Sequence, residues 1–510
     1  MAVIAIDLGT TSCKAAVFVG SLMLGSAYRH YSYTSPVEGW AEQDAEAVWE
    51  LVDAVVKETL RAIPALPSIQ AVCVSVQGDA IIPIDVSGTA LHPAVLGMDI
   101  RSYREAADLQ EKFGRGQLYS STGMPCEPLN AITKIFWLRR HRPELNGRVW
   151  KYVHYEEFLL MRLAGVPALD FSMASRTMAF DPVRKDWVGP ILEFVGITPS
   201  QLGNLTPSGA PIGIIRRYVA SDWGIDVKAL VVAGGHDQCM AAIGAGVIEA
   251  DMACYSMGTA EVISTCFGSP RMTPAMLESN YPCYCHAVKD QYFTITLNQS
   301  GGLSLEWFQN SIMELGGLSD HDWNRTYDEL ISRLKLEPSP VLFLPHIVGS
   351  GTPTCDHMSR GTFLGLSLKS TRTEMFQAVV ESLAFEARLN LDQLENLGID
   401  VHELRGVGGG SRSRAILELK ATVLNQPICT LKNPRAALLG TALLSQVAAG
   451  QFPDLSAACR EGVQIDQTVE PVAEAAERYA SAFERYRQLY GTLRSFYHNW
   501  RAECATTVTV

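Results

Sequence analysis

Several features are missing from this 510-residue sequence, and each absence narrows the class of protein. There is no run of about 18 apolar residues, so we expect no membrane-spanning helix. The start of the chain carries no basic segment and Asp7 interrupts its first apolar stretch, so we expect no signal peptide. No run of Lys and Arg is present, and the net charge of −12 disfavours nucleic acid as a partner because phosphate would be repelled.

Cysteine usage and common binding motifs exclude further classes. The 12 cysteines are scattered mostly singly through apolar segments, which favours reduced thiols and a cytoplasmic location. The sequence has no GxxxxGK[ST] motif, so we expect no P-loop. Cys283, Cys285 and His286 lie close together, but no second ligand pair follows at zinc-site spacing, so we expect no metal there. Adjacent Glu156 and Glu157 would point in different directions on a helix, which favours solvated or capping positions over an acid pair.

Strand and helix patterns alternate along the whole chain, which is typical of an α/β fold. Apolar residues at helical spacing follow Asp44, which can cap that helix. The run AVCVSV at 71–76 indicates a buried strand. Residues 472–501 are rich in Ala, Glu, Arg and Tyr, and they predict one closing helix that begins after Pro471.

The two halves of the chain open in the same way. A pair of strands joined by a turn with Gly and Thr lies at 4–18, and a similar pair lies at 253–265. We therefore predict two related α/β domains, over residues 1–245 and 246–500.

The first of these turns, DLGTTSCK at 7–14, has the composition of a phosphate-binding loop. A glycine-centred turn directs several N–H groups at one point, and hydroxyls add donors. The candidate binding residues are Asp7, Thr10, Thr11, Ser12 and Lys14. Asp7 could hold a magnesium ion through water, and Lys14 could reach a phosphate or face solvent. An ordinary polar hairpin is the alternative.

The segment GGHDQ follows an apolar strand and contains the candidate catalytic residue. An acidic side chain at the carboxyl end of such a strand is suited to accept a proton from an attacking hydroxyl. Asp237 occupies this position. The alternative is that Asp237 only caps the following helix. His236 is expected to position or pack rather than to act as a base.

Two glycine clusters could let a nucleotide lie against the backbone. Gly301 and Gly302 precede a helix, although they could also simply end a strand. Glycines 408–410 follow a strand and are followed by Ser411. Glycine-rich loops alone are weak signals, so both sites depend on their context.

At this point the chain resembles the FGGY carbohydrate kinases, a family of the actin-like ATPase superfamily. The most specific match is GTFLGLSLKSTRTEMFQAVVE, which fits the C-terminal signature of the family at Gly361, Phe363, Gly365, Leu366, Glu374, Met375, Ala378, Val379, Val380 and Glu381. TKIFWLRRHRPEL is similar to the N-terminal signature at Lys134, Trp137 and Leu138, and DFSMASRTMAFD is similar to the segment before the interdomain region. The resemblance covers residues 4–446.

The resemblance implies two ribonuclease-H-like domains with a cleft between them, and phosphate transfer from ATP with Mg²⁺. Asp237 matches the catalytic base and Asp7 the magnesium-proximal aspartate, and both would act on the metal through water. The implied nucleotide-binding residues are Thr10, Thr11, Ser12, Lys14, Gly258, Thr259, Gly301, Gly302, Gly409, Gly410 and Ser411. By analogy with the family, a homodimer is the suggested assembly.

The resemblance places the sugar against the first domain. The expected substrate-binding residues come from SVQGDA, GMDIR and GGHDQ, and they are Gln77, Asp79, Asp99, Arg101, His236 and Asp237. For Asp99 and Arg101 a local ion pair is the alternative. We favour substrate contact because ligands bind at strand ends in such folds.

Among the family the chain looks most like xylulokinases, which makes a ketopentose such as D-xylulose the favoured substrate. Xylulokinases typically carry Gln-Met-His where this chain has QGD at 77–79, and Trp-Asn-Asp where it has GMD at 97–99. Ribulose, a polyol such as erythritol, or a sugar acid such as gluconate therefore stay open.

Two other classes of protein are weighed against a kinase. IDLGTT also resembles chaperone ATPases, but too little chain follows the nucleotide loop for a peptide-binding domain. A sugar-binding regulator without catalysis is disfavoured by Asp237 and by the two phosphate loops.

Overall fold

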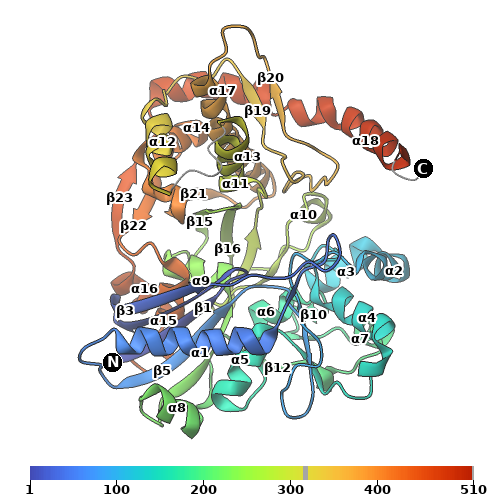
Figure 1. The fold of residues 1–510 in the computed structure, drawn as a ribbon, viewed down its shortest axis with the longest axis vertical. Helices are drawn as coiled ribbons and strands as arrows, with labels where there is room; N and C mark the ends of the chain where they lie inside the picture. Colours follow the sequence, from blue (N-terminus) through green and yellow to red (C-terminus); the bar gives the residue numbers. More distant parts are fainter. Residues whose placement is uncertain (314–319, 508–510) are drawn as a thin grey trace.

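The structure, a computed structural model, describes residues 1–313 and 320–507 and consists of two α/β lobes (Figure 1). Each lobe is built on one large mixed β-sheet with helices packed against it. This arrangement confirms the predicted fold class.

The sheet of the N-terminal lobe has six strands. Their order is β13 (Pro211–Ile214), β14 (Leu230–His236), β5 (Ile69–Val76), β1 (Ala2–Leu8), β2 (Ser12–Val19) and β3 (Leu22–His30). Strands β14, β5 and β1 are parallel, and β1 is buried along its whole length. Burial on both faces explains why β1 and β5 are nearly continuous apolar runs rather than alternating ones. Shorter strands are β4 (Glu42–Gln43), β6 (Ile82–Ile84), β7 (Ala94–Val95), β8 (Lys151–Val153), β9 (Ala168–Asp170), β10 (Phe180–Asp181), β11 (Asp186–Trp187) and β12 (Asn204–Thr206).

The helices named for this lobe all follow β3 in the chain. They are α1 (Ala45–Arg61), α2 (Tyr103–Phe113), α3 (Arg115–Thr122), α4 (Ala131–His141), α5 (Tyr155–Ala164), α6 (Phe171–Arg176), α7 (Gly189–Val195), α8 (Arg217–Trp223) and α9 (Asp237–Gly244). The Asp44 carboxylate accepts the N–H groups of Glu46 and Ala47 at the start of α1, which confirms the predicted cap.

The C-terminal lobe repeats this plan with a seven-stranded sheet. The order is β17 (Tyr284–Cys285), β18 (Tyr292–Ile295), β16 (Glu261–Phe267), β15 (Asp251–Met257), β21 (Val401–Val407), β22 (Ile428–Leu431) and β23 (Ile465–Val469). Strands β15, β21 and β22 are parallel, as β1, β5 and β14 are in the first lobe. A small separate pair consists of β19 (Leu342–Leu344) and β20 (Thr362–Leu364). The helices are α10 (Pro274–Glu278), α11 (Gly301–Trp307), α12 (Asp320–Ser332), α13 (Arg372–Asn396), α14 (Arg414–Leu424), α15 (Ala436–Ala448), α16 (Leu455–Gly462), α17 (Ala473–Tyr486) and α18 (Leu489–Thr507).

A β-hairpin opens each lobe, as the sequence predicts. β1 and β2 are antiparallel with Asp7 opposite Lys14, and β15 and β16 are antiparallel with Met257 opposite Glu261. In both lobes the first strand of the hairpin also pairs in parallel with a later strand, so the two turns occupy equivalent places. The chain therefore carries the same hairpin turn at equivalent places in its two lobes.

Helix α15 belongs to the second half of the chain but packs on the first lobe. It contacts α9, β1 and β5, and Figure 1 places it beside β1 and β3. The α9–α15 contact is close, because a Cβ added at Gly440 would lie 2.0 Å from the Met240 carbonyl oxygen. The predicted domain boundary at residue 245 stays a prediction. Helix α15 lies after this boundary in the sequence but packs against the first lobe.

The prediction of a single closing helix over residues 472–501 is wrong. The structure has two helices there, α17 and α18, separated at residues 487–488. Both Tyr486 at the end of α17 and Tyr497 in α18 pack into the same apolar core of the C-terminal lobe. A break between them changes the direction of the chain and allows both contacts.

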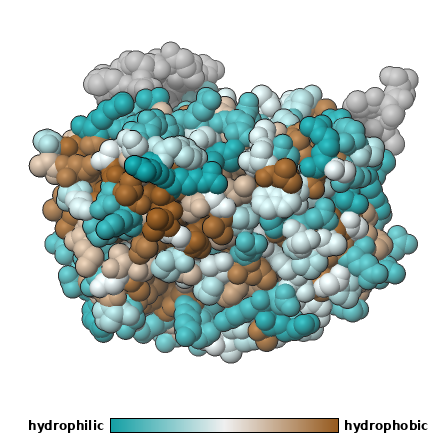
Figure 2. Space-filling view, turned by 90° about the horizontal axis from the view of Figure 1, so that it is seen from below, coloured by the Kyte–Doolittle hydropathy of each residue, from teal (hydrophilic) through white to brown (hydrophobic). Residues whose placement is uncertain are grey.

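No helix in the described part of the chain is long and apolar enough to cross a membrane. Figure 2 views the molecule from the lower end of Figure 1, where most of the surface is hydrophilic and the apolar residues gather toward one side.

Candidate active site

The two hairpins meet at a cavity of about 600 Å³ that both lobes line. The N-terminal lobe contributes Asp7, Ser12, Lys14 and Asp237, and the C-terminal half contributes Ser256, Gly408, Gly409, Arg412 and Arg435. The fold thus brings predicted site residues from three distant segments to one place.

Thr10 and Thr11 hold the shape of the first loop through their backbone. The Thr10 carbonyl accepts the Gln43 side-chain amide at 2.9 Å, and the Thr11 carbonyl accepts the Tyr31 N–H at 3.0 Å. Neither threonine lines the 600 Å³ cavity, whereas Ser12 does. The loop is therefore braced by strand β3 and by the segment before α1.

The Asp7 carboxylate lies at the cavity with two partners of its own lobe. Lys14 Nζ is 3.3 Å from Asp7 Oδ2, and the Ser75 hydroxyl donates to Oδ1 at 3.2 Å. The Lys14 side chain is 39% exposed and also lines the cavity. Lys14 therefore faces the site rather than bulk solvent alone, which answers the question that its position on the second strand left open.

Asp237 is the first residue of α9 and does not cap it. The N-cap residue is His236, and no side-chain capping bond is present. The capping interpretation of Asp237 is therefore wrong. The carboxylate is 25% exposed and lines the cavity. Burial, reinforced by the negative charge of Asp7, raises the pKa of Asp237 from 3.8 to about 7. A carboxylate with a pKa near neutrality is a suitable general base.

His236 is held between the two lobes beside that carboxylate. Its Nε2 lies 3.4 Å from Asp237 Oδ1, and its Nδ1 lies 3.3 Å from the Tyr284 hydroxyl. Burial and the nearby Arg176 lower the pKa of His236 well below 6.5, so the ring is neutral. This supports positioning rather than proton abstraction.

The donor set at the cavity suits a magnesium ion that keeps its water. Asp7 and Asp237 are the carboxylates on the cavity wall. Within residues 1–313 and 320–507, no group of three or more His, Cys, Asp or Glu side chains is arranged to hold a metal. Magnesium commonly binds through one or two carboxylates, waters and phosphate oxygens, so this sparse set fits it.

A second cavity of about 690 Å³ adjoins the first in the C-terminal lobe. The predicted nucleotide residues among its lining are Gly258, Thr259, Gly302, Gly409 and Gly410. Gly409 lines both cavities, so they lie side by side at the glycine turn. Lys420 and Glu261 also line it and form a buried ion pair, with Lys420 donating to the Tyr255 hydroxyl as well.

Two of the residues predicted to bind the nucleotide, Gly301 and Ser411, line neither cavity and contact other parts of the protein instead. A Cβ on Gly301 would lie 2.7 Å from the Glu261 nitrogen, so glycine is needed for α11 to approach the second loop. The Ser411 hydroxyl donates to the Gly408 carbonyl at 2.8 Å and shapes the glycine turn. Gly302 N–H donates to the Gly258 carbonyl at 2.8 Å, so part of α11 braces the loop.

Gln77 and Asp79 lie in the loop after β5, next to the base. Gln77 Nε2, Asp79 Oδ1 and Arg176 Nε are buried and have no hydrogen-bond partner among the residues that the structure describes. The other Asp79 oxygen pairs with Arg176, and a Cβ on Gly78 would lie 2.9 Å from His236 Nε2 and 3.3 Å from Arg176 Nε. Buried polar atoms are nearly always paired, so this group is a candidate subsite for a polar ligand.

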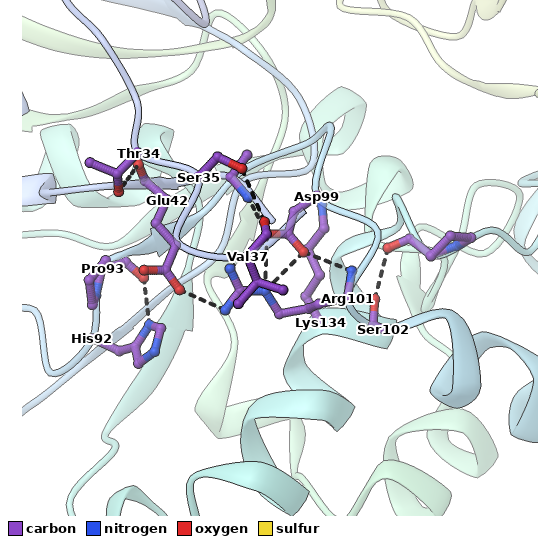
Figure 3. Close-up of polar contacts among 12 residues, drawn as sticks. Thr34, Ser35, Val37, Glu42, His92, Pro93, Asp99, Arg101, Ser102 and Lys134 are labelled. Carbon is purple, nitrogen blue, oxygen red and sulfur yellow. Dashed lines mark hydrogen bonds and ion pairs between the residues drawn. The ribbon is translucent and has the colours of Figure 1, made fainter. Parts of the chain in front are cut away.

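Asp99 and Arg101 form a buried ion pair, which is the alternative that the sequence left open. Arg101 donates to both Asp99 oxygens and to Glu42, and neither side chain of the Asp99–Arg101 pair has exposed surface (Figure 3). The guanidinium also lies 3.8 Å from the Trp40 ring centroid. In the structure this pair joins the segment before α1 to the loop after β7, and it offers a ligand no free surface.

Sequence reasoning missed three residues at the site. Arg176 lies in a segment recognised for its family resemblance, but its pairing with Asp79 depends on the fold. Tyr284 lies within the cysteine-rich segment that had been considered only as a metal site. Arg435 lines the first cavity from the start of α15, and its side chain also donates to the Ser26 hydroxyl in the other lobe.

Glu156 and Glu157 are both fully buried, so the expectation of solvated positions is wrong. Glu157 accepts the His154 N–H at 2.9 Å and caps α5, as the capping alternative predicted. Glu156 accepts the N–H groups of Asp170 and Gly234 at 3.0 and 3.1 Å. It thereby fixes the strand that leads to Asp237.

Two phosphate-loop hairpins that meet across a cleft, with an aspartate between them, define the actin-like class of two-domain phosphotransferases. The chain belongs to the FGGY family of carbohydrate kinases: residues 2–244 match its N-terminal domain and residues 253–449 match its C-terminal domain. This confirms the family resemblance seen in the sequence.

The individual proteins that resemble this chain share a low sequence identity with it. The chain is 26% identical to the xylulose kinase of Staphylococcus epidermidis, over 94% of each chain. It is 25% identical to the gluconokinase of Bacillus subtilis, over 93% of this chain and 92% of that one. The fold superposes on a xylulose kinase structure from Lactobacillus acidophilus with a TM-score of 0.90 at 24% identity, covering 98% of this chain and 99% of that one.

Proposed function

We propose that this protein transfers the γ-phosphate of ATP to a hydroxyl of a small neutral sugar, with a ketopentose such as D-xylulose as the first candidate. The observation that carries the proposal is Asp237, whose pKa is raised to about 7 within a cavity lined by both phosphate-loop hairpins. The relatives named xylulose kinase support a ketopentose.

In this proposal each part of the cavity has one task. Asp237 accepts the proton of the sugar hydroxyl, whose oxygen attacks the γ-phosphorus while the bond to the ADP oxygen breaks. The first loop with Ser12 and Lys14, and the second loop with Gly258 and Thr259, hold the phosphates. Asp7 and Asp237 would hold a hydrated Mg²⁺, which neutralises charge on the transferred group. Closure of the lobes excludes water, a competing acceptor.

The charge of the candidate sugar subsite supports a neutral sugar over a sugar acid. Arg176, the cation beside Gln77 and His236, is already paired with Asp79. A carboxylate ligand would meet the negative charges of Asp79 and Asp237, and the charge of Arg176 is already balanced by Asp79, although its Nε–H stays without a partner among the described residues. Hydroxyls can instead use the unpaired donor of Gln77 and the unpaired acceptor of Asp79.

A substrate screen tests the proposal. The purified protein with Mg-ATP is assayed for ADP release with D-xylulose, ribulose, erythritol and gluconate, each at the same concentrations. We expect the highest kcat/KM with a ketopentose. Turnover of gluconate alone would contradict the sugar class, and no turnover with any of a wider panel of sugars, polyols and sugar acids would contradict the kinase.

The base assignment is tested with Asp237→Asn and a matched surface variant, Asp290→Asn. Asp290 is 67% exposed and pairs only with Lys185 among the described residues. We expect Asp237→Asn to lower kcat by about 10²–10⁴-fold with ATP binding retained, and Asp290→Asn to behave like the wild type. Near-normal turnover by Asp237→Asn would refute the assignment.

The cytoplasmic location and the homodimer that the sequence suggested belong to the same proposal. Sedimentation of the purified protein tests the dimer directly.

A further inference from the structure

We propose that Tyr284 of the C-terminal lobe is a positioning residue that fixes the tautomer of His236, and that His236 in turn holds the carboxylate of Asp237. The inference deepens the proposed function, because it rests on Asp237 being the base of that reaction.

The three side chains form one continuous contact chain. The Tyr284 hydroxyl lies 3.3 Å from His236 Nδ1, and His236 Nε2 lies 3.4 Å from Asp237 Oδ1. Tyr284 has no exposed surface and His236 is 4% exposed. Water therefore does not compete for either ring nitrogen, and the protein alone decides what each nitrogen faces.

The imidazole ring is held in place on its remaining sides. A Cβ on Gly78 would lie 2.9 Å from Nε2, so the ring packs directly on the Gly78 backbone. The His236 N–H donates to the Ser172 hydroxyl at 3.0 Å, which anchors the backbone of the same residue. With the ring confined, the orientation of the two nitrogens is set and only the tautomer is free.

Chemistry then favours one tautomer. A neutral imidazole carries its proton on one nitrogen and accepts at the other. If the Tyr284 hydroxyl donates to Nδ1, the proton lies on Nε2, and this N–H faces the Asp237 carboxylate at a contact distance of 3.4 Å. The same carboxylate accepts a hydrogen bond from the Gln238 side-chain amide at 3.3 Å. The opposite tautomer would place the Nε2 lone pair against a carboxylate oxygen. Within the part of the chain that the structure describes, the Tyr284 hydroxyl is the group at hydrogen-bond distance from Nδ1, so its loss removes this contribution to the preference for the Nε2–H tautomer.

Tyr284 itself is fixed to the lobe that carries the base. In its segment, the Tyr281 carbonyl accepts the Tyr119 hydroxyl at 2.6 Å, and Cys283 N–H donates to the Gly123 carbonyl at 2.7 Å. A Cβ on Gly123 would lie 1.8 Å from the Cys283 carbonyl oxygen, so the two backbones are in direct contact. The Cys-X-Cys-His segment thus reaches across from the second lobe and completes the geometry of the base.

The test compares Tyr284→Phe with Tyr281→Phe. Tyr281 is equally buried in the same segment, but its hydroxyl contacts Asn390 in α13, away from the base. Each variant removes one buried hydroxyl and keeps the ring. Kinetics are measured with Mg-ATP and the sugar found active in the screen. The tautomer of His236 is read from ¹⁵N–¹H NMR of the imidazole, with the signal assigned by its loss in His236→Gln. Thermal unfolding confirms that the variants are folded.

We expect Tyr284→Phe to lower kcat by about tenfold or more, with the KM for ATP changed less than about twofold, and Tyr281→Phe to match the wild type. We also expect the wild-type ring to be protonated at Nε2, and the Tyr284→Phe ring to show a weaker preference for Nε2, because the Asp237 carboxylate still favours that tautomer. A wild-type kcat in Tyr284→Phe, equal losses in both variants, or a wild-type ring protonated at Nδ1 would overturn the inference. If the wild type phosphorylates no sugar, the proposed function fails, and the NMR result still decides the inference.

Discussion

Helix α9, which begins at Asp237, packs very closely against α15, and this contact predicts a large effect of one added methyl group. In Gly440→Ala the new Cβ would lie 2.0 Å from the Met240 carbonyl oxygen and 2.7 Å from the Gly244 nitrogen. Comfortable contacts between such atoms are about 3.5 Å or longer. The two helices must therefore move apart by roughly 1.5 Å, because backbone atoms cannot turn aside.

Two opposing contributions to the free energy of unfolding set the size of the effect of Gly440→Ala. Alanine in a helix interior gains about 1 kcal/mol over glycine. Overpacking of a filled core costs about 1–3 kcal/mol, and a contact as short as this one belongs at the upper end. We expect Gly440→Ala to lower the free energy of unfolding by about 2 kcal/mol. Because α9 carries the base, a shift near 1 Å also predicts a fall in kcat of about 100-fold.

Urea unfolding followed by circular dichroism measures the first effect, and steady-state kinetics with the active sugar measures the second. Gly491→Ala is the matched control, since Gly491 lies in helix α18 and its Cβ would meet nothing within 4 Å. That variant should gain up to about 1 kcal/mol and keep the wild-type kcat. If Gly440→Ala matched Gly491→Ala in both measurements, the close approach of α9 and α15 would be refuted.

Two further predictions concern buried charges of the C-terminal lobe. Lys420→Met removes the cationic partner of Glu261, which keeps only the Tyr255 hydroxyl among its described side-chain partners. We therefore expect a loss of about 3–5 kcal/mol in the free energy of unfolding and weaker ATP binding. Recovery of stability in Lys420→Met/Glu261→Gln checks the cause, and a double variant no more stable than the single one would contradict it. Burial raises the pKa of Glu381 from 4.5 to about 7, so the folded state binds a proton that the unfolded state has lost between these values. The free energy of unfolding should therefore fall as pH rises from 4.5 to 7, by up to about 3 kcal/mol from this residue. In urea titrations at pH 5 and pH 8, Glu381→Gln should show a smaller difference in stability between the two pH values than the wild type. An unchanged difference would contradict the raised pKa of Glu381.

Local patterns in the sequence were sufficient for the elements and for their order. The Gly-Thr turns predicted both hairpins, Asp44 predicted the start of α1, and the alternation of strands and helices predicted two α/β lobes. Each of these depends on neighbouring residues, whose preferences for turns, caps and buried strands act over a few positions. The prediction failed over 472–501, because the direction change between α17 and α18 follows from packing against a distant core.

The pairing of side chains from distant segments depended on tertiary structure. Asp99 and Arg101 had the composition of a ligand site, yet the fold buries them together with Glu42. The pairing of Arg176 with Asp79 depends on the folding of the first lobe, and Tyr284 reaches His236 only because the second lobe packs against the first.

The sequence alone, through its motifs and its resemblance to the FGGY family, thus predicted a phosphate-binding kinase with Asp237 as its base. Whether a given polar side chain faces a ligand or another side chain was decided by the three-dimensional contacts, because a buried polar group bonds to whichever partner the fold brings within about 3 Å.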